Sequence, residues 1–270
     1  MKGDAEEVCG GPSAEGEDSP SGSESGLRSA ATRIECRVFP EIDSLAEAAA
    51  EAVIHLLRGA VKERGCGFIS LSGGSTPEPL YRLLSSPRYD EAVAWERIHL
   101  LWGDERVVPP DHEASNFSLV SRSGLLRRNL AGVHRMPGEM EPEEAAADYE
   151  HRLRALWPRG DVQLDVGLLG LGSDGHTASL FPGAPEVTEA RKWVVATEKH
   201  AGFRRLTLTL PVFWSSSCLL FLVSGSGKRN ALRGVFRHDE GLPAYLVVQG
   251  ARRVVWLVDQ EAGGGIEPCR

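Results

Sequence analysis

The segment richest in groups that could do chemistry surrounds His176. It reads GLGSDGHTASLFPG over residues 170–183 and follows the apolar run LDVGLL at 164–169. A histidine in a glycine-rich loop after a strand can face a ligand with little steric cover, and imidazole can act as a general base near neutral pH. A lone histidine is more often structural, but this position favours catalysis. The preceding Asp174 either orients the ring or caps a short helix after it.

A second glycine-rich segment predicts an anion site. It follows the apolar run GFISL at 67–71 and reads Ser72-Gly73-Gly74-Ser75-Thr76-Pro77. Its glycines allow the backbone to approach a ligand, its hydroxyls can donate, and a helix that begins there adds free amides and its dipole. No Gly-Lys-Ser/Thr follows, so the segment is not a Walker loop. The alternative is a plain glycine turn before a capped helix. The candidate binding residues are Gly73, Gly74, Ser75 and Thr76.

Charged and polar side chains follow a third apolar run, IHLLW at 98–102. Gly103-Asp104-Glu105-Arg106 comes directly after it, and Asn116 follows further along. Solvated loop charges are the alternative interpretation. Two more cations, Arg205 before the run LTLTL and Lys228 after CLLFLVSGSG, are either surface charges or neighbours of the same pocket.

Apolar runs and helical patterns alternate along most of the chain. The expected strands are 33–39, 67–71, 98–102, 164–169, 193–197, 206–210, 218–223, 245–248 and 254–258. The expected helices are 44–64 with a capping box of Ser44 and Glu47 and a stop at Gly65, one that opens at Thr76-Pro77, 143–156 and 228–236. This alternation is typical of an α/β fold with a doubly wound, mainly parallel sheet and helices on both faces. Ligands of such sheets bind beyond the carboxyl ends of the strands, where the candidate residues lie.

The composition limits the classes of partner. The formal net charge is −8, and no basic segment would hold nucleic acid or an anionic membrane. No apolar run approaches the roughly 18 residues of a membrane span. The first residues contain no hydrophobic signal segment, so we expect a cytoplasmic protein.

Three regions are expected along the chain. Residues 1–30 are rich in Gly, Ser, Glu and Pro and nearly lack large apolar side chains, which predicts a disordered acidic tail. Residues 31–260 are expected to form a single α/β catalytic domain. Residues 261–270 are expected to form a short flexible C-terminal tail.

Neither a metal nor a cofactor is expected. The five cysteines contain no CxxC pair, and no HExxH or similar ligand spacing occurs. Gly170, Gly172 and Gly175 match the dinucleotide pattern GxGxxG. Pro182 and Pro185 leave no room for the long helix that carries a pyrophosphate, so we interpret this match as accidental.

Taken together, five segments resemble the 6-phosphogluconolactonase family in order and spacing: LSGGSTPEPLY, WGDERVVPPDHEASN, GLGSDGHTASLFPG, RLTLTLP and VSGSGK. The similarity covers about residues 33–259. GxGxDGHTASLFP is highly specific to that family, whereas SGGSTP is shared with the related glucosamine-6-phosphate isomerases/deaminases. The resemblance implies a fold like that of both families, with phosphate near the first glycine loop.

The resemblance also implies an activity and roles. The reaction would be hydrolysis of 6-phospho-D-glucono-1,5-lactone to 6-phospho-D-gluconate in the oxidative pentose phosphate pathway. His176 would take a proton from the attacking water, and Arg106 would place the substrate or stabilise charge. Arg205 and Lys228 would bind phosphate with the Gly73–Thr76 loop.

One segment departs from the family pattern. The family often has a proline-rich stretch before the arginine of RLTLTLP, whereas this chain has His200-Ala201-Gly202-Phe203-Arg204. Arg204 and Arg205 are therefore both candidates for the phosphate contact.

Two other functions are weighed against the lactonase. An amino-sugar-phosphate isomerase/deaminase would have a different segment after its glycine–histidine pair, whereas ThrAlaSerLeuPhePro follows His176 here. A non-catalytic sugar-phosphate sensor would have no need of a base. The expected partner is a small phosphorylated sugar lactone, and the sequence does not decide between a monomer and a homodimer.

Overall fold

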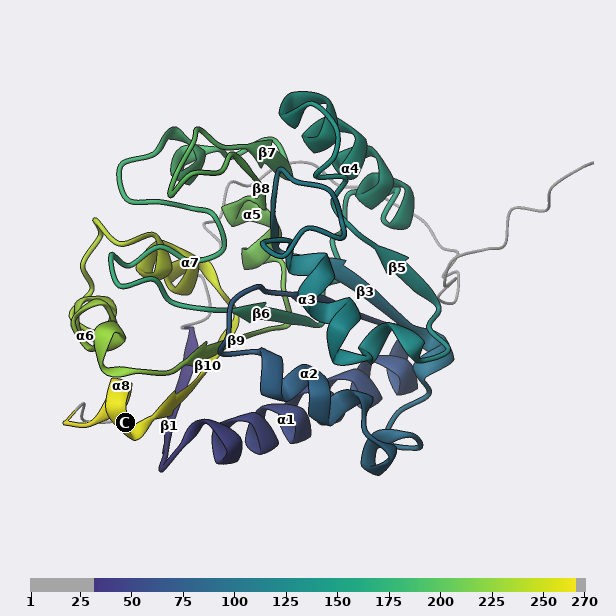
Figure 1. Cartoon of the computed structure of the whole chain (residues 1–270), viewed down its shortest axis with the longest axis horizontal. Helices are drawn as coiled ribbons and strands as arrows, with labels where there is room; N and C mark the ends of the chain where they lie inside the picture. Colours follow the sequence, from purple (N-terminus) through teal and green to yellow (C-terminus); the bar gives the residue numbers. More distant parts are fainter. Residues whose placement is uncertain (1–31, 266–270) are drawn as a thin grey trace, which may run out of the picture.

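The structure, a computed structural model, describes residues 32–265 and is built on a seven-stranded parallel sheet (Figure 1). The strand order is β1 (Arg33–Phe39), β10 (Arg253–Asp259), β9 (Cys218–Val223), β6 (Val166–Leu169), β2 (Gly67–Leu71), β3 (Ile98–Trp102) and β5 (Gly132–His134). All six pairings are parallel. Figure 1 shows α1 and α2 below this sheet and α5 and α7 above it. The predicted doubly wound α/β fold is confirmed.

The eight α-helices connect and cover these strands. They are α1 (Ile42–Arg64), α2 (Glu78–Ser85), α3 (Asn116–Ser123), α4 (Pro142–Leu156), α5 (Leu210–Trp214), α6 (Arg229–Phe236), α7 (Pro243–Gly250) and α8 (Gln260–Gly263) in the described part of the chain. Five short 3-10 helices add to them: η1 (Pro87–Tyr89), η2 (Trp95–Arg97), η3 (Leu125–Arg127), η4 (Pro185–Thr188) and η5 (Ser226–Lys228).

Helix α1 shows how the sequence pattern produces packing. Leu45, Val53 and Leu57 lie on one face and are fully buried, and the helix contacts β1, β2, β6, β9 and β10. It ends as predicted at Gly65, whose φ of 81° is a left-handed conformation that glycine adopts without a Cβ penalty. The predicted capping box is wrong, because the helix begins before Ser44, whose hydroxyl donates to the Glu41 carbonyl instead.

A second, antiparallel sheet of three strands lies beside the parallel one. Its order is β4 (Asp104–Arg106), β8 (Arg205–Leu208) and β7 (Val194–Ala196). The sequence predicted strands at 193–197 and 206–210, but β4 and the separation into two sheets were not foreseen. The register of β4 and β8 places Arg106 opposite Arg205.

Two expected elements differ from the structure. The run 245–248, predicted as a strand, lies inside α7, which begins at Pro243 with proline at its first helical position. A short apolar run fits a buried helix as well as a strand, so its pattern alone could not decide. The helix expected to open at Thr76-Pro77 is α2, which begins at Glu78 with Pro77 as its N-cap and no side-chain cap.

The core and the chain ends complete the fold. Every residue of β2, β3, β6 and β9 is buried, as expected of strands covered on both faces.

The prediction of a disordered tail over residues 1–30 lies outside the described residues. So does part of the tail expected over 261–270, whose first residues belong to α8. Within residues 32–265, no helix is long and apolar enough to cross a membrane.

A histidine pair at the edge of the sheet makes stability depend on pH. His99 Nδ1 lies 3.1 Å from His134 Nε2, and Phe68 stacks on His99. Burial lowers the pKa of both rings, and for His134, where the charges of His99 and Arg152 add to burial, it falls to about 4. In the unfolded chain the pKa of a histidine is about 6.5. Between about pH 4 and pH 6.5 the unfolded chain therefore binds more protons than the native state.

We therefore predict that the free energy of unfolding decreases as the pH falls from about 6.5 towards 4. Denaturant titration at pH 7 and pH 4.5 measures this loss. His134→Gln cannot take up a proton and should lose less stability over the same interval. Equal losses for the wild type and the variant would contradict the assignment to this pair.

Candidate active site

A cavity of about 520 Å³ brings together ten of the residues that the sequence analysis proposed for the site, and of its candidates only Arg204, the alternative to Arg205, does not line it. It lies where β2, β6 and β9 end and beside the pairing of β4 with β8. The residues that line it include His176, Asp174, Arg106, Gly73, Gly74, Ser75, Thr76, Asn116, Arg205 and Lys228. Segments from five separate parts of the chain therefore meet at one place, as the rule for parallel sheets predicts.

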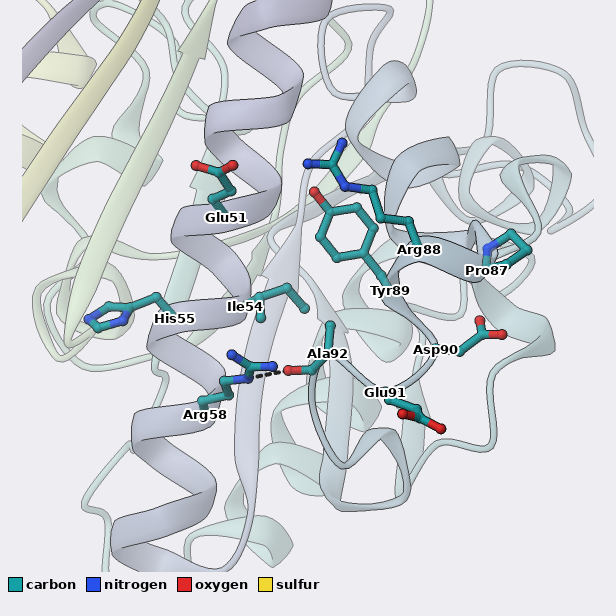
Figure 2. Close-up of a pocket in the computed structure, with 10 residues that line it drawn as sticks. All are labelled: Glu51, Ile54, His55, Arg58, Pro87, Arg88, Tyr89, Asp90, Glu91 and Ala92. Carbon is teal, nitrogen blue, oxygen red and sulfur yellow. Dashed lines mark hydrogen bonds between the residues drawn. The ribbon is translucent and has the colours of Figure 1, made fainter.

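A larger hollow of about 640 Å³ lies elsewhere, between α1 and residues 87–92 (Figure 2). None of the ten candidate residues lines it. Figure 2 shows Arg58 donating to the Ala92 carbonyl, with charged side chains of both signs around it. Its size alone does not make it the better site, because the chemical groups converge in the other cavity.

The imidazole of His176 is held by its neighbour in the loop. Its Nδ1 lies 2.6 Å from Asp174 Oδ1, and the same oxygen accepts from the His176 backbone N–H at 3.2 Å. No helix starts directly after this pair, so Asp174 orients the ring rather than capping a helix. Gly172 leaves the necessary space, since a Cβ there would lie 2.0 Å from His176 Nδ1.

The electrostatics of the pocket favour a neutral ring. Burial lowers the pKa of His176, and the hydrogen bond and charge of Asp174 partly oppose this effect. The side chain is 30% exposed, which leaves it accessible from the cavity. With the Nδ1 proton directed at Asp174, the lone pair of the neutral ring is on Nε2. The ring is therefore equipped to accept a proton near pH 7.

The glycine loop after β2 is fitted closely to its surroundings. A Cβ at Gly73 would lie 1.8 Å from Asn116 Oδ1, and Gly74 has a φ of 91°, which favours glycine. The Tyr81 hydroxyl donates to the Ser72 carbonyl at 2.7 Å and accepts from its N–H at 2.9 Å. The loop is thus fixed at its start, and at Gly73 and Gly74 its backbone lines the cavity without side chains.

Two arginines lie side by side because β4 pairs with β8. Arg106 donates to the Ala114 carbonyl at 3.0 Å and to Asn116 Oδ1. Arg205 is only 8% exposed, and its Nε has no hydrogen-bond partner among the described residues. Burial, followed by the charge of Arg106, lowers the pKa of Arg205. An anion between these side chains would relieve both the desolvation and the repulsion.

The neighbouring Arg204 faces another direction. It forms an ion pair with Glu143 on α4, and its Nε donates to the Thr197 carbonyl at 3.1 Å. It does not line the cavity, whereas Arg205 does. Of the two arginine candidates for the phosphate contact, only Arg205 faces the site. Lys228, in η5 after β9, is a half-buried cation that also lines the cavity.

Two buried acids, Asp104 and Glu105, directly precede Arg106 and were not among the candidate residues. Asp104, 8% exposed, accepts from the Ser179 hydroxyl at 2.7 Å and from Asn116 Nδ2 at 3.2 Å. Glu105 accepts from the N–H groups of Asn116 and Phe117 at the start of α3 and from that of Arg106. The signal for both was a pair of acids directly after a buried strand. Their hydrogen bonds to distant loops were not visible in the sequence.

Phe181 and His200 also line the cavity and were not among the candidates.

Within the described residues, no group of three or more His, Cys, Asp or Glu side chains could hold a metal ion. The next helical segment after the GxGxxG match is the four-residue η4, which is too short to carry a pyrophosphate as dinucleotide-binding helices do.

Comparisons with known proteins identify the family of this chain. The family described as glucosamine-6-phosphate isomerases/6-phosphogluconolactonase matches residues 40–256. The chain belongs to this family. The resemblance seen in its motifs is therefore confirmed.

Similar proteins are found both by sequence and by structure. A 6-phosphogluconolactonase of Synechocystis sp. is 38% identical over 232 residues, which cover 83% of this chain and 95% of the relative, and one of Nostoc sp. is 36% identical over 84% and 95%. The crystal structure of 6-phosphogluconolactonase from Thermotoga maritima has a TM-score of 0.74 at 30% identity and covers 84% of this chain and 100% of its own. The structure of 6-phosphogluconolactonase from Trypanosoma brucei has a TM-score of 0.78 at 25% identity, with coverage of 87% and 100%.

The His176–Asp174 pair yields a prediction that needs no substrate. Asp174→Asn removes the negative charge that raises the pKa of His176, so this pKa should fall below its wild-type value. Titration of the ring protons by NMR measures the shift. Asp161→Asn, a change of an exposed acid outside the cavity, serves as the control and should leave the titration unchanged. A higher pKa in Asp174→Asn would contradict the geometry.

Proposed function

We propose that this chain hydrolyses 6-phospho-D-glucono-1,5-lactone to 6-phospho-D-gluconate, with His176 as the general base. The observation that carries the proposal is that one cavity is lined by an oriented imidazole, by Arg106 and Arg205, and by the glycine loop after β2. The relatives at 36–38% identity are named 6-phosphogluconolactonases, which are hydrolases of a cyclic carboxylic ester. The reaction belongs to the oxidative pentose phosphate pathway.

The proton transfers follow from the state of the ring. Nε2 of neutral His176 removes a proton from a water molecule as its oxygen adds to the lactone carbonyl. The imidazolium that forms is stabilised by the carboxylate of Asp174 at Nδ1. When the tetrahedral intermediate collapses, the C–O bond to the ring oxygen breaks and His176 returns its proton to that oxygen. The products are the hydroxyl group and the carboxylic acid, which ionises.

The remaining charges have separate roles in this mechanism. The carbonyl oxygen becomes an anion in the intermediate, and the guanidinium of Arg106 or the loop amides stabilise it. Arg205, Lys228, Asn116 and the Gly73–Thr76 loop hold the substrate by its phosphate and polar groups. An activated cyclic ester requires neither a covalent intermediate nor a metal, so these side chains suffice.

Two other functions are distinguished by simple assays. The family description also covers glucosamine-6-phosphate isomerases, and release of ammonia from glucosamine 6-phosphate would favour that activity. A sugar-phosphate sensor would bind 6-phosphogluconate without turning over the lactone. The oriented base favours an enzyme, since binding alone does not require one.

The catalytic domain and the cellular location are part of the same proposal. We place the activity in a single catalytic domain over residues 31–260 and in the cytoplasm. Two relatives from Oryza sativa are named probable 6-phosphogluconolactonase 3, chloroplastic.

Replacing the base should abolish most of the activity. His176→Ala is expected to lower kcat by about 10²–10⁴-fold while 6-phosphogluconate still binds. The lactone is generated freshly from glucose 6-phosphate, and its loss above the spontaneous rate is followed for the wild type and the variant. His55→Ala, a change of an exposed histidine on α1, is the control and should retain full activity. Equal rates for the wild type and His176→Ala at high enzyme concentration would remove His176 from this role.

The two neighbouring arginines form a matched pair for testing the anion site. Arg205→Ala should weaken binding of 6-phosphogluconate about 10- to 100-fold, because it removes hydrogen bonds between charged groups. Arg204→Ala loses a partly exposed ion pair with Glu143 and a hydrogen bond to the Thr197 carbonyl, both outside the cavity, and should bind within about twofold of the wild type. Calorimetric titration compares the two variants. Equal weakening in both would exclude a specific contact from Arg205.

A further inference from the structure

Phe181 separates the active-site cavity from an adjoining pocket. The second pocket measures about 410 Å³ and shares Asp174, Phe181 and His200 with the cavity. Phe181 itself is only 5% exposed. The ring therefore lies against His176 and lines both the active-site cavity and the second pocket, which His176 itself does not line.

Three side chains of the cavity contact this phenyl ring. The His200 imidazole stacks on it with ring centroids 3.7 Å apart and an interplanar angle of 25°. The His176 ring lies 4.6 Å away at an angle of 43°, and the guanidinium carbon of Arg205 lies 5.1 Å from the ring centroid. His200 makes the closest of these contacts and is also the most exposed of the three residues.

His200 is held in position by a tight turn. Its N–H donates to the Phe203 carbonyl at 2.8 Å, and the Phe203 N–H donates back at 3.2 Å. Ala201 and Gly202 between them have φ values of 49° and 89°, as in the two-residue turns that close β-hairpins. The Phe203 ring contacts His112 edge-on at 6.2 Å, which joins the turn to the loop after Arg106. The turn therefore presents the imidazole at a fixed place on the cavity wall.

We infer that His200 is a positioning residue for the reaction: its ring holds Phe181 against His176 and keeps water away from the base on that side. This inference rests on the proposed function, because it assigns the base to His176.

The physical consequence concerns the protonation of His176. The groups that act on the ring are Asp174 in its own loop and Asp104 on β4, which raise its pKa, and Arg205 on β8, which lowers it. Burial is the largest influence and also lowers it. Without the His200 ring, one face of Phe181 opens to the adjoining pocket and water approaches His176. Weaker desolvation then stabilises the imidazolium.

The test compares His200→Ala with His200→Phe. In His200→Ala the pKa of His176, followed by NMR of its ring protons, should rise by about 0.5 unit or more. The acid limb of kcat/KM should move to higher pH with it, which lowers kcat/KM about threefold below that pKa. His200→Phe keeps a ring on Phe181 but cannot titrate, and it should restore both values. Lys199→Ala, a change in the residue next to His200 that lines only the outer pocket, is the matched control and should resemble the wild type.

Each outcome either supports or overturns the inference. An unchanged His176 titration in His200→Ala would overturn it. A His200→Phe protein that behaves like His200→Ala would also overturn it, because the imidazole itself would then be required. A wild-type protein without lactonase activity would refute the proposed function, whereas the NMR titration would still report whether His200 positions Phe181 against His176.

Discussion

The buried carboxylate of Asp104 connects the parts of the cavity. It accepts from Ser179, three residues after His176, and from Asn116 at the start of α3. Burying a carboxylate costs several kcal/mol unless hydrogen bonds and opposite charge compensate. Here Ser179 and Asn116 supply the hydrogen bonds, and Arg205 is close enough for Asp104 to favour its charged form. The loop that carries the base, the helix that carries Asn116 and the strand that carries Arg106 are therefore stabilised in one arrangement.

The antiparallel pairing of β4 with β8 holds two cations, Arg106 and Arg205, opposite each other. Two guanidinium groups repel each other, and burial adds to the cost, as the lowered pKa of Arg205 reflects. The backbone hydrogen bonds of the small sheet provide a rigid frame that keeps Arg106 opposite Arg205. The free energy stored in this repulsion becomes available when an anion binds. A site on regular strands also loses less entropy on binding than one on free loops.

Much of the scaffold could be predicted because apolar runs bounded by glycine and polar residues are strong signals. The strand at 218–223 was predicted to the residue, and the parallel sheet followed from the alternation of strands and helices. The run at 245–248 failed, since four apolar residues fit a buried helix equally well. Strand β4 is only three residues long and polar, so it has no periodicity to recognise.

The candidate residues could be chosen from the sequence, but their positions relative to one another could not. His176, Arg106 and the glycine loop each follow a strand, and the topology of a parallel sheet brings such positions together. The choice between Arg204 and Arg205 depended on strand register, which decides the face on which a side chain lies. Asp104 acts through hydrogen bonds to residues far along the chain, and sequence spacing contains no information on such contacts. The stacking of His200 on Phe181 is a contact of the same kind, so the sequence does not predict it.

A general base in this cavity has to satisfy two opposing requirements. Its ring must be neutral before the reaction, which burial and the charge of Arg205 favour. It must also carry a positive charge while the intermediate exists, which Asp174 and Asp104 favour. The two acids favour the imidazolium, and burial and the arginine favour the neutral ring, so the opposing influences act on the same proton. In the proposed mechanism, the mixed charge of the cavity is therefore the feature by which one imidazole would take up a proton and return it.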